Sequence, residues 1–98
     1  MIYKYSLGAP YQTGQGYFKL PILQATVKKV LDIQMQGPVA VLWAEVEADE
    51  IDTYLEIAVA WTGYEEPEGI PYFKTIQEPS TGLVYHYYVA NPIAGYDL

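Results

Sequence analysis

Hydrophobic and polar residues alternate along most of this chain, in short runs that turn-forming residues interrupt at fairly regular spacing. Side chains of a strand point alternately to its two faces, so such alternation is typical of half-buried β-strands. The pattern predicts strands at residues 2–7, 17–20, 26–35, 39–47, 53–62, 72–77 and 83–90. Glycine, proline and acidic residues separate these runs. Residues 20–25 allow one helical turn, and no longer stretch has apolar residues at helical spacing.

The alternation also predicts which side chains face the core. The apolar rows of the two central runs are Ala40, Leu42, Ala44 and Val46 in one and Leu55, Ile57, Val59 and Trp61 in the other. We expect these two runs to form a hairpin at the centre of a sheet. In the run 26–35, Leu31 and Ile33 are expected to face inward, and Lys28-Lys29 breaks the alternation, which predicts a bulge there.

The last run is aromatic on both faces. Tyr85 and Tyr87 share one face, and His86 and Tyr88 share the other. We expect this run to be an edge strand through which copies of the chain associate. Strands at regular spacing predict an all-β fold, a small antiparallel sandwich or partly open barrel of about seven strands. The whole chain, residues 1–98, is expected to be one such domain.

The composition excludes several kinds of chemistry. The chain has no cysteine, no arginine and one histidine, and most catalytic and metal-binding sites use those residue types. We therefore expect no enzyme activity, no metal and no cofactor. No apolar run approaches the roughly 20 residues that span a bilayer, and the first residues do not form a secretory signal. These features favour a soluble intracellular protein without a membrane partner.

The net charge of −7 narrows the choice of partner. Acidic residues would repel a phosphate backbone, and arginine, which contacts phosphate and guanine best, is missing. Direct nucleic-acid binding is therefore not expected. A protein with a basic surface is the electrostatic complement. The alternative is that the charge only keeps a tyrosine-rich surface dispersed.

Eleven tyrosines are too many for the core of a chain this small. Tyrosine is enriched at interfaces because its rigid ring buries much area at little entropic cost. Exposed tyrosines beside carboxylates would suit a partner surface, whereas cross-strand aromatic pairing is the alternative explanation. The candidate interface consists of Tyr64, Glu65, Glu66, Glu68, Trp43, Glu45, Glu47, Tyr85, Tyr87 and Tyr88.

Two other groups have alternatives of their own. His86 is either a general base or a ring packed among aromatic neighbours and bonded to a backbone carbonyl, and no metal-ligand spacing accompanies it. The acidic residues of 45–52 either charge a hairpin edge against strand pairing, or provide in Glu45 and Glu47 a pair that binds calcium or acts as acid and base. That segment lacks the ligand and glycine pattern of a calcium loop.

The order of several segments resembles a family of short bacteriophage proteins of unknown function. The matching segments are Ile2-Tyr3-Lys4-Tyr5, Leu20-Pro21, Val30-Leu31-Asp32-Ile33-Gln34, Leu42-Trp43-Ala44-Glu45-Val46, Thr62-Gly63, Tyr72-Phe73-Lys74-Thr75-Ile76-Gln77 and Val84-Tyr85-His86. Tyr85 replaces the tryptophan usual in that family, Lys74 replaces a glycine, and the turn 51–54 differs. The resemblance implies a phage origin and a life in the host cytoplasm, and it supplies no activity.

We therefore expect a non-enzymatic phage accessory protein that binds a host protein with a basic surface, as an inhibitor of host defence or metabolism. A homo-oligomer that sequesters a small nucleotide-like ligand is one alternative, which aromatic stacking supports and the lack of arginine opposes. A minor virion or capsid-decorating component is another.

Overall fold

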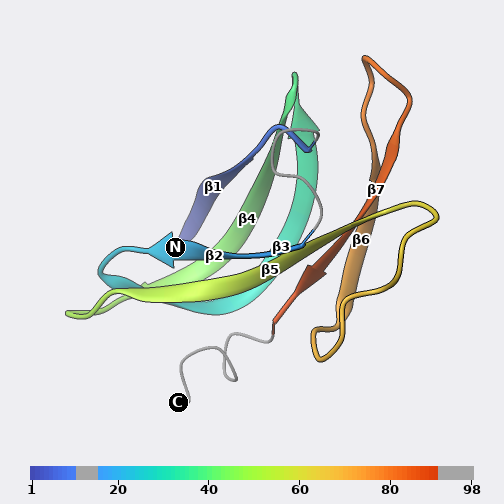
Figure 1. Ribbon diagram of the computed structural model, residues 1–98. Coiled ribbons are helices and arrows are strands. Elements are labelled where there is room, and N and C mark those ends of the chain that lie inside the picture. The colour runs from blue at the N-terminus through green and yellow to red at the C-terminus, as the bar shows by residue number, and fades with distance from the viewer. Residues whose placement is uncertain (11–15, 91–98) are drawn as a thin grey trace.

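The computed structural model describes residues 1–10 and 16–90, and seven β-strands run through them (Figure 1). Each strand predicted from the alternation is present, and no end differs by more than two residues. The strands are β1 (Ile2–Gly8), β2 (Gly16–Ile22), β3 (Ala25–Gln36), β4 (Val39–Ala48), β5 (Thr53–Trp61), β6 (Tyr72–Gln77) and β7 (Val84–Val89).

The strands form two antiparallel sheets that face each other. One has the order β1-β4-β3 and the other the order β2-β5-β7-β6. Buried side chains from all seven strands form one core between the sheets. The prediction of an all-β fold is confirmed, and of the two architectures that the sequence left open, the structure has the sandwich.

The two sheets are joined at a corner where two connections lie together. One is the turn at Leu23 and Gln24, and the other is the acidic segment 49–52. The Gln24 N–H donates to Asp52 Oδ1 at 2.7 Å, and the Asp49 N–H donates to the Gln24 carbonyl at 3.0 Å. Gln24 has a φ of 50°, a left-handed conformation that lets the chain turn sharply. Asp52 therefore stabilises the corner.

Two predictions about this region are wrong. β4 and β5 do not form a hairpin within one sheet, because segment 49–52 carries the chain from one sheet to the other. Residues 20–25 contain no helical turn, since β2 continues to Ile22 and β3 begins at Ala25. Alternation predicts each strand and its faces, but it contains no information about whether a short turn stays within a sheet.

β3 contains two bulges. The predicted one is confirmed by a register shift against β4 between Val27 and Lys29. A second shift, between Val30 and Asp32, turns Leu31 outward, and its side chain is 39% exposed. Ile33 is fully buried as expected, whereas the inward placement of Leu31 is wrong because the second bulge reverses the alternation.

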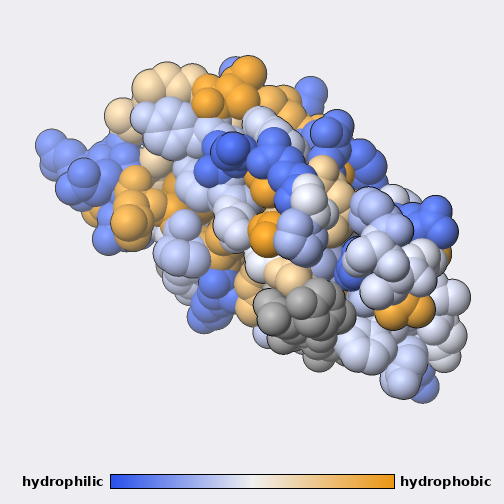
Figure 2. Space-filling model, turned by 90° about the horizontal axis from the view of Figure 1, so that it is seen from above, coloured by the Kyte–Doolittle hydropathy of each residue, from blue (hydrophilic) through white to orange (hydrophobic). Residues whose placement is uncertain are grey.

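The core contains the apolar rows that the sequence predicted. The inward side chains of β4, from Ala40 to Val46, and those of β5 from Leu55 to Val59 are at most 2% exposed. Trp61 is only half-buried and packs at the rim of this core. On the face seen from above, apolar residues form separate patches among hydrophilic ones (Figure 2). No broad apolar area is visible in that view.

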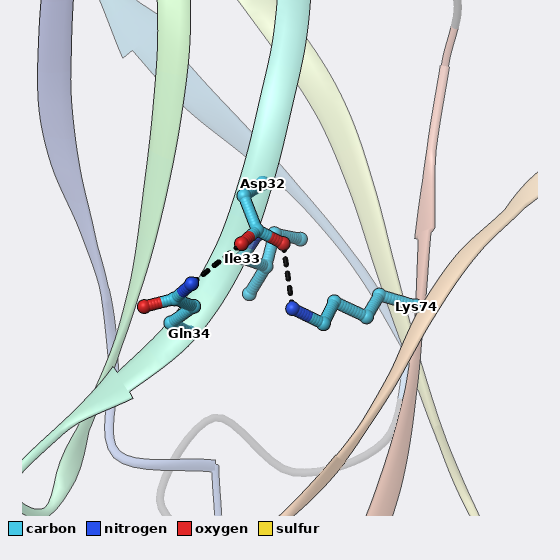
Figure 3. Close-up of polar contacts among 4 residues, drawn as sticks. All are labelled: Asp32, Ile33, Gln34 and Lys74. Carbon is cyan, nitrogen blue, oxygen red and sulfur yellow. Dashed lines mark hydrogen bonds and ion pairs between the residues drawn. The ribbon is translucent and has the colours of Figure 1, made fainter.

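An ion pair connects the two sheets where β3 faces β6. Lys74 Nζ on β6 lies 2.6 Å from Asp32 Oδ1 on β3 (Figure 3). The Gln34 side-chain amide and the Ile33 N–H also donate to the Asp32 carboxylate. The Lys74 hydrogen bond, with smaller help from these two donors, lowers the pKa of Asp32 below its ordinary value. The carboxylate is thus held in its charged form between the sheets.

Lys74→Met is expected to lower the free energy of unfolding by about 1 kcal/mol, because it removes a partly buried, charge-assisted contact. Lys28→Met is the matched control, since its pair with Glu47 is exposed, and it should change stability by less than about 0.3 kcal/mol.

The pH dependence follows from the lowered pKa of Asp32. Its contribution to the free energy of unfolding is complete above the ordinary pKa of 3.8 and is lost as the pH falls through the lower pKa of the folded protein. Urea unfolding at pH 7 and pH 3 measures both effects, and equal losses for the two variants would contradict this account.

Four strands lie at sheet edges, and each has an irregular feature. β1, β3 and β6 contain register shifts, and β2 contains Pro21, which has no N–H to donate. β7, by contrast, lies between β5 and β6. The expectation that the last strand is an edge through which copies associate is therefore wrong, because both of its edges are already paired within the chain.

Candidate binding site at the acidic loop

The segment 62–71, here called the acidic loop, connects β5 to β6 and lies along the outer face of the four-stranded sheet (Figure 1). Ile70 is 6% exposed and packs on Ala58, Ala60 and Tyr88 in a small second core. The outward residues of β5 beneath the loop, Ala58 and Ala60, are small, so the loop can approach the sheet closely. Apolar packing therefore fixes the end of the loop that leads into β6.

Hydrogen bonds fix the loop at three further points. The Tyr17 hydroxyl on β2 donates to the Glu68 carbonyl at 2.9 Å. The Tyr64 N–H donates to the Trp61 carbonyl, and the Val89 N–H donates to the Pro71 carbonyl, both at 3.0 Å. The loop is thus attached to β2, β5 and β7, and its exposed side chains are held in place before any partner binds.

Three hollows lie along the acidic loop. The first, of about 340 Å³, lies between Tyr17 and the carboxylates at 65, 66 and 68. The second, here called the histidine hollow, has a volume of about 140 Å³ and is lined by Trp61, Thr62, Tyr64, Glu66, His86 and Tyr88. The third, here called the apolar hollow, has about 320 Å³ and is lined by Trp61, Thr62, Tyr64, Leu83, Val84 and Tyr85. The last two hollows share one wall.

His86 is held by threonine hydroxyls on both sides of its ring. Its Nε2 lies 2.9 Å from Thr62 Oγ1, and its Nδ1 lies 2.9 Å from Thr75 Oγ1. Thr62 also donates to the Val84 carbonyl, so in the neutral ring Nε2–H donates to Thr62 and Nδ1 accepts from Thr75. The Thr75 hydroxyl in turn bonds the Tyr72 hydroxyl at 2.7 Å. The alternative in which His86 bonds a backbone carbonyl is wrong, because threonine hydroxyls bond both ring nitrogens.

The carboxylates of the acidic loop have no counter-ion among residues 1–10 and 16–90. The ion pairs found there join Lys28 to Glu47 and Lys74 to Asp32. Glu65, Glu66 and Glu68 are exposed. Burial, and secondly the charge of Glu66, raise the pKa of Tyr88 on the sheet below. The loop therefore presents uncompensated negative charge next to aromatic side chains.

The structure separates the predicted interface into two groups. Tyr64, Glu65, Glu66 and Glu68 lie together on the acidic loop, as expected from their sequence. The second group, Trp43, Glu45 and Glu47, lies on the outer face of the other sheet, because the even-numbered residues of β4 face the core. Trp43 is half-buried, and Glu47 pairs with Lys28. These two groups do not form one surface.

The tyrosines of β7 are buried rather than exposed. Tyr87 is 0% exposed in the core, and Tyr85 is 2% exposed with Trp61 edge-on to its ring at 6.2 Å. Tyr88 is 8% exposed beside Tyr72, at 5.7 Å. Their assignment to an accessible interface is corrected, because loop and strand neighbours cover them. Tyr85 and Tyr88 instead form walls of the hollows.

Sequence reasoning missed several residues of the site. Thr62 lies on the acidic loop and Thr75 on β6, and no sequence pattern connects either residue with His86. Leu83 is 54% exposed and lines the apolar hollow, although it stands in the same alternating row as the buried Tyr85. Tyr17 was recognised only as one tyrosine among eleven, and its contact with Glu68 bridges 51 residues of sequence.

Within the described part of the chain, no three histidine, cysteine or acidic side chains are grouped as metal ligands. The same residues include no helix with the length and apolarity needed to cross a membrane.

Comparison with known proteins identifies the family. Residues 1–95 match a family described as a domain of unknown function, DUF7352. No curated protein and no solved structure matches this chain. The match covers all seven strands and the acidic loop. The chain therefore belongs to the DUF7352 family.

Proposed function

We propose that this protein is a non-enzymatic binding protein that docks its acidic loop on a basic surface of another protein. The observation that carries the proposal is the set of three exposed carboxylates, Glu65, Glu66 and Glu68, without a lysine partner in the described residues, on a loop that is already fixed. Charges of one sign speed the encounter with an opposite surface. A fixed loop loses little conformational entropy on binding.

The surroundings of His86 support binding over catalysis. Both ring nitrogens are bonded to threonine hydroxyls, and Thr62 donates its proton to the Val84 carbonyl rather than to His86 Nε2, so the ring is not placed to activate this hydroxyl as a nucleophile. A catalytic histidine is usually oriented by a carboxylate and faces a nucleophile or a bound water. In this site the imidazole holds two strands and the loop together.

The resemblance to short bacteriophage proteins supports a more specific version of the proposal. In that version the protein is made during infection, acts in the host cytoplasm and inhibits a host defence or metabolic protein. The net charge of −7 is consistent with a basic target.

Capture from an infected-cell lysate tests the proposal with three forms of the immobilised protein. The wild type and the control variant Glu45→Gln/Glu47→Gln/Glu50→Gln should retain the same basic protein. The loop variant Glu65→Gln/Glu66→Gln/Glu68→Gln, which loses the same charge, should bind it at least about tenfold more weakly. Equal retention by both variants, or no specific protein bound by the wild type, would reject the proposal.

A small-ligand site is the second candidate, and the apolar hollow favours it. Its volume of about 320 Å³ is within the range of ligand pockets. Its aromatic walls, formed by Trp61, Tyr64 and Tyr85, are also typical of such pockets. Mass spectrometry of molecules released when the freshly purified protein is denatured tests this candidate. A stoichiometric planar compound would support it, and none bound would exclude it.

A further inference from the structure

The histidine hollow has the size and the walls of a seat for one cationic side chain. Its volume of about 140 Å³ is below the roughly 300 Å³ at which small-molecule sites begin. Three aromatic residues, Trp61, Tyr64 and Tyr88, line it together with the Glu66 carboxylate. Aromatic rings attract a cation through their negative faces, and a nearby carboxylate adds to that attraction.

We propose that this hollow receives the ammonium group of a lysine side chain from the protein's partner. The proposal rests on the proposed function, and it names the group by which a basic partner would be recognised. Glu66 supplies the negative charge, and no lysine of the described residues is paired with it.

The hydrogen-bonding groups of the hollow favour lysine over arginine. A guanidinium has five N–H donors in a rigid plane and needs several acceptors around it. Both nitrogens of His86 are already bonded, and the Thr62 hydroxyl is shared between His86 and the Val84 carbonyl. Glu66 is the one carboxylate among the described residues that line the hollow. An ammonium, compact and with three donors, can satisfy itself with Glu66 and water.

The apolar hollow defines what stands next to the lysine. The two hollows share the wall formed by Trp61, Thr62 and Tyr64, and Leu83 and Val84 also line the apolar hollow. A partner segment that places a lysine in one hollow therefore brings a neighbouring side chain to the other. We infer that this neighbour is a large apolar residue.

NMR titration with capped hexapeptides that contain one Leu-Lys step tests the proposal directly. The chain has one histidine and two tryptophans, so the signals of His86, Trp61 and Trp43 are resolved from one another. The Leu-Lys peptide should shift the His86 and Trp61 ring signals and leave the Trp43 signal on the other sheet unchanged. Peptides with arginine or Nε-acetyl-lysine in place of lysine, or alanine in place of leucine, should bind at least about fivefold more weakly.

Two variants complete the test. Glu66→Gln should weaken binding of the Leu-Lys peptide by about fivefold or more, whereas Glu45→Gln, on the outer face of the other sheet and outside this hollow, should change it less than about twofold. Equal affinity for the lysine and acetyl-lysine peptides, equal effects of the two variants, or no shift at about 10 mM peptide would overturn the proposal. The peptide can fail while the loop variant with three glutamines still does not retain the captured protein. That result would reject the lysine site and leave the proposed function supported.

Discussion

Raising the pH from 10 to 12 is expected to lower the free energy of unfolding by about 3 kcal/mol or more. The buried tyrosines of β7 are the cause. Burial, and secondly the neighbouring Tyr85 and Glu78, raise the pKa of Tyr87 far above its ordinary value of 10.0. Burial also raises the pKa of Tyr85 and of Tyr88.

The free energy of unfolding falls at alkaline pH because the unfolded chain releases the Tyr87 proton at a lower pH than the folded chain does. Above pH 10 the unfolded chain releases the Tyr87 proton while the folded chain keeps it, so deprotonation favours unfolding. The contribution of Tyr87 is therefore complete below pH 10 and is lost as the pH rises toward the pKa of the folded state. One such group removes about 1.4 kcal/mol for each pH unit in that range.

The variant Tyr87→Phe isolates this effect. The free energy of unfolding that this variant loses between pH 10 and pH 12 should be smaller than the loss of the wild type by about 2 kcal/mol. Near pH 7 its stability should be equal or higher, because the buried Tyr87 hydroxyl has no hydrogen-bond partner within the described residues. Urea unfolding at a series of pH values measures both quantities. Tyr54→Phe is the control for loss of a surface hydroxyl, and the same pH profile for wild type and Tyr87→Phe would refute the assignment.

Ile57→Ala is expected to lower the free energy of unfolding by about 3–4 kcal/mol. Ile57 is 0% exposed at the centre of β5, where it contacts the core between both sheets, so its loss leaves a cavity that neighbours cannot fill completely. Ile51→Ala is the matched control, since it makes the same chemical change in a side chain that is 60% exposed.

The control should change stability by less than about 0.5 kcal/mol. Urea unfolding at neutral pH compares the three proteins. A loss of under about 1.5 kcal/mol for Ile57→Ala would mean that the two sheets do not share a tightly packed core, because a loosely packed site collapses after truncation.

The sequence predicted the strands of this fold well because each strand is encoded locally. Alternation defines the inward rows, as with Leu42 and Ile57, and Gly-Pro or acidic turns mark the ends. Relations between strands were harder. The segment 49–52 looks like a hairpin turn, and only the contact of Asp52 with Gln24, 28 residues away, makes it a corner between sheets. Leu31 was misplaced because the second bulge has no polar signature.

The candidate site was predicted in part for the same reason. The acidic loop is contiguous in sequence, so its carboxylates and Tyr64 were found together. The sequence predicts the β7 tyrosines at an accessible interface because it shows neither that Tyr85 and Tyr87 face the core between the sheets nor that the loop returns over the sheet and packs Ile70 on Tyr88. The threonine partners of His86 come from two other segments, 24 and 11 residues away, and no local pattern connects them.

The irregular edge strands have a consequence for how this molecule behaves at high concentration. The segment Leu55–Trp61 is rich in β-branched and apolar residues, and as an excised peptide it would be prone to stack into amyloid fibrils. In the folded chain β2 and β7 pair with both edges of this segment. The edge strands contain register shifts or a proline, so they pair poorly with a strand of another molecule. Fibril growth should therefore require global unfolding first, and its lag time should follow the unfolding equilibrium rather than the concentration of native protein.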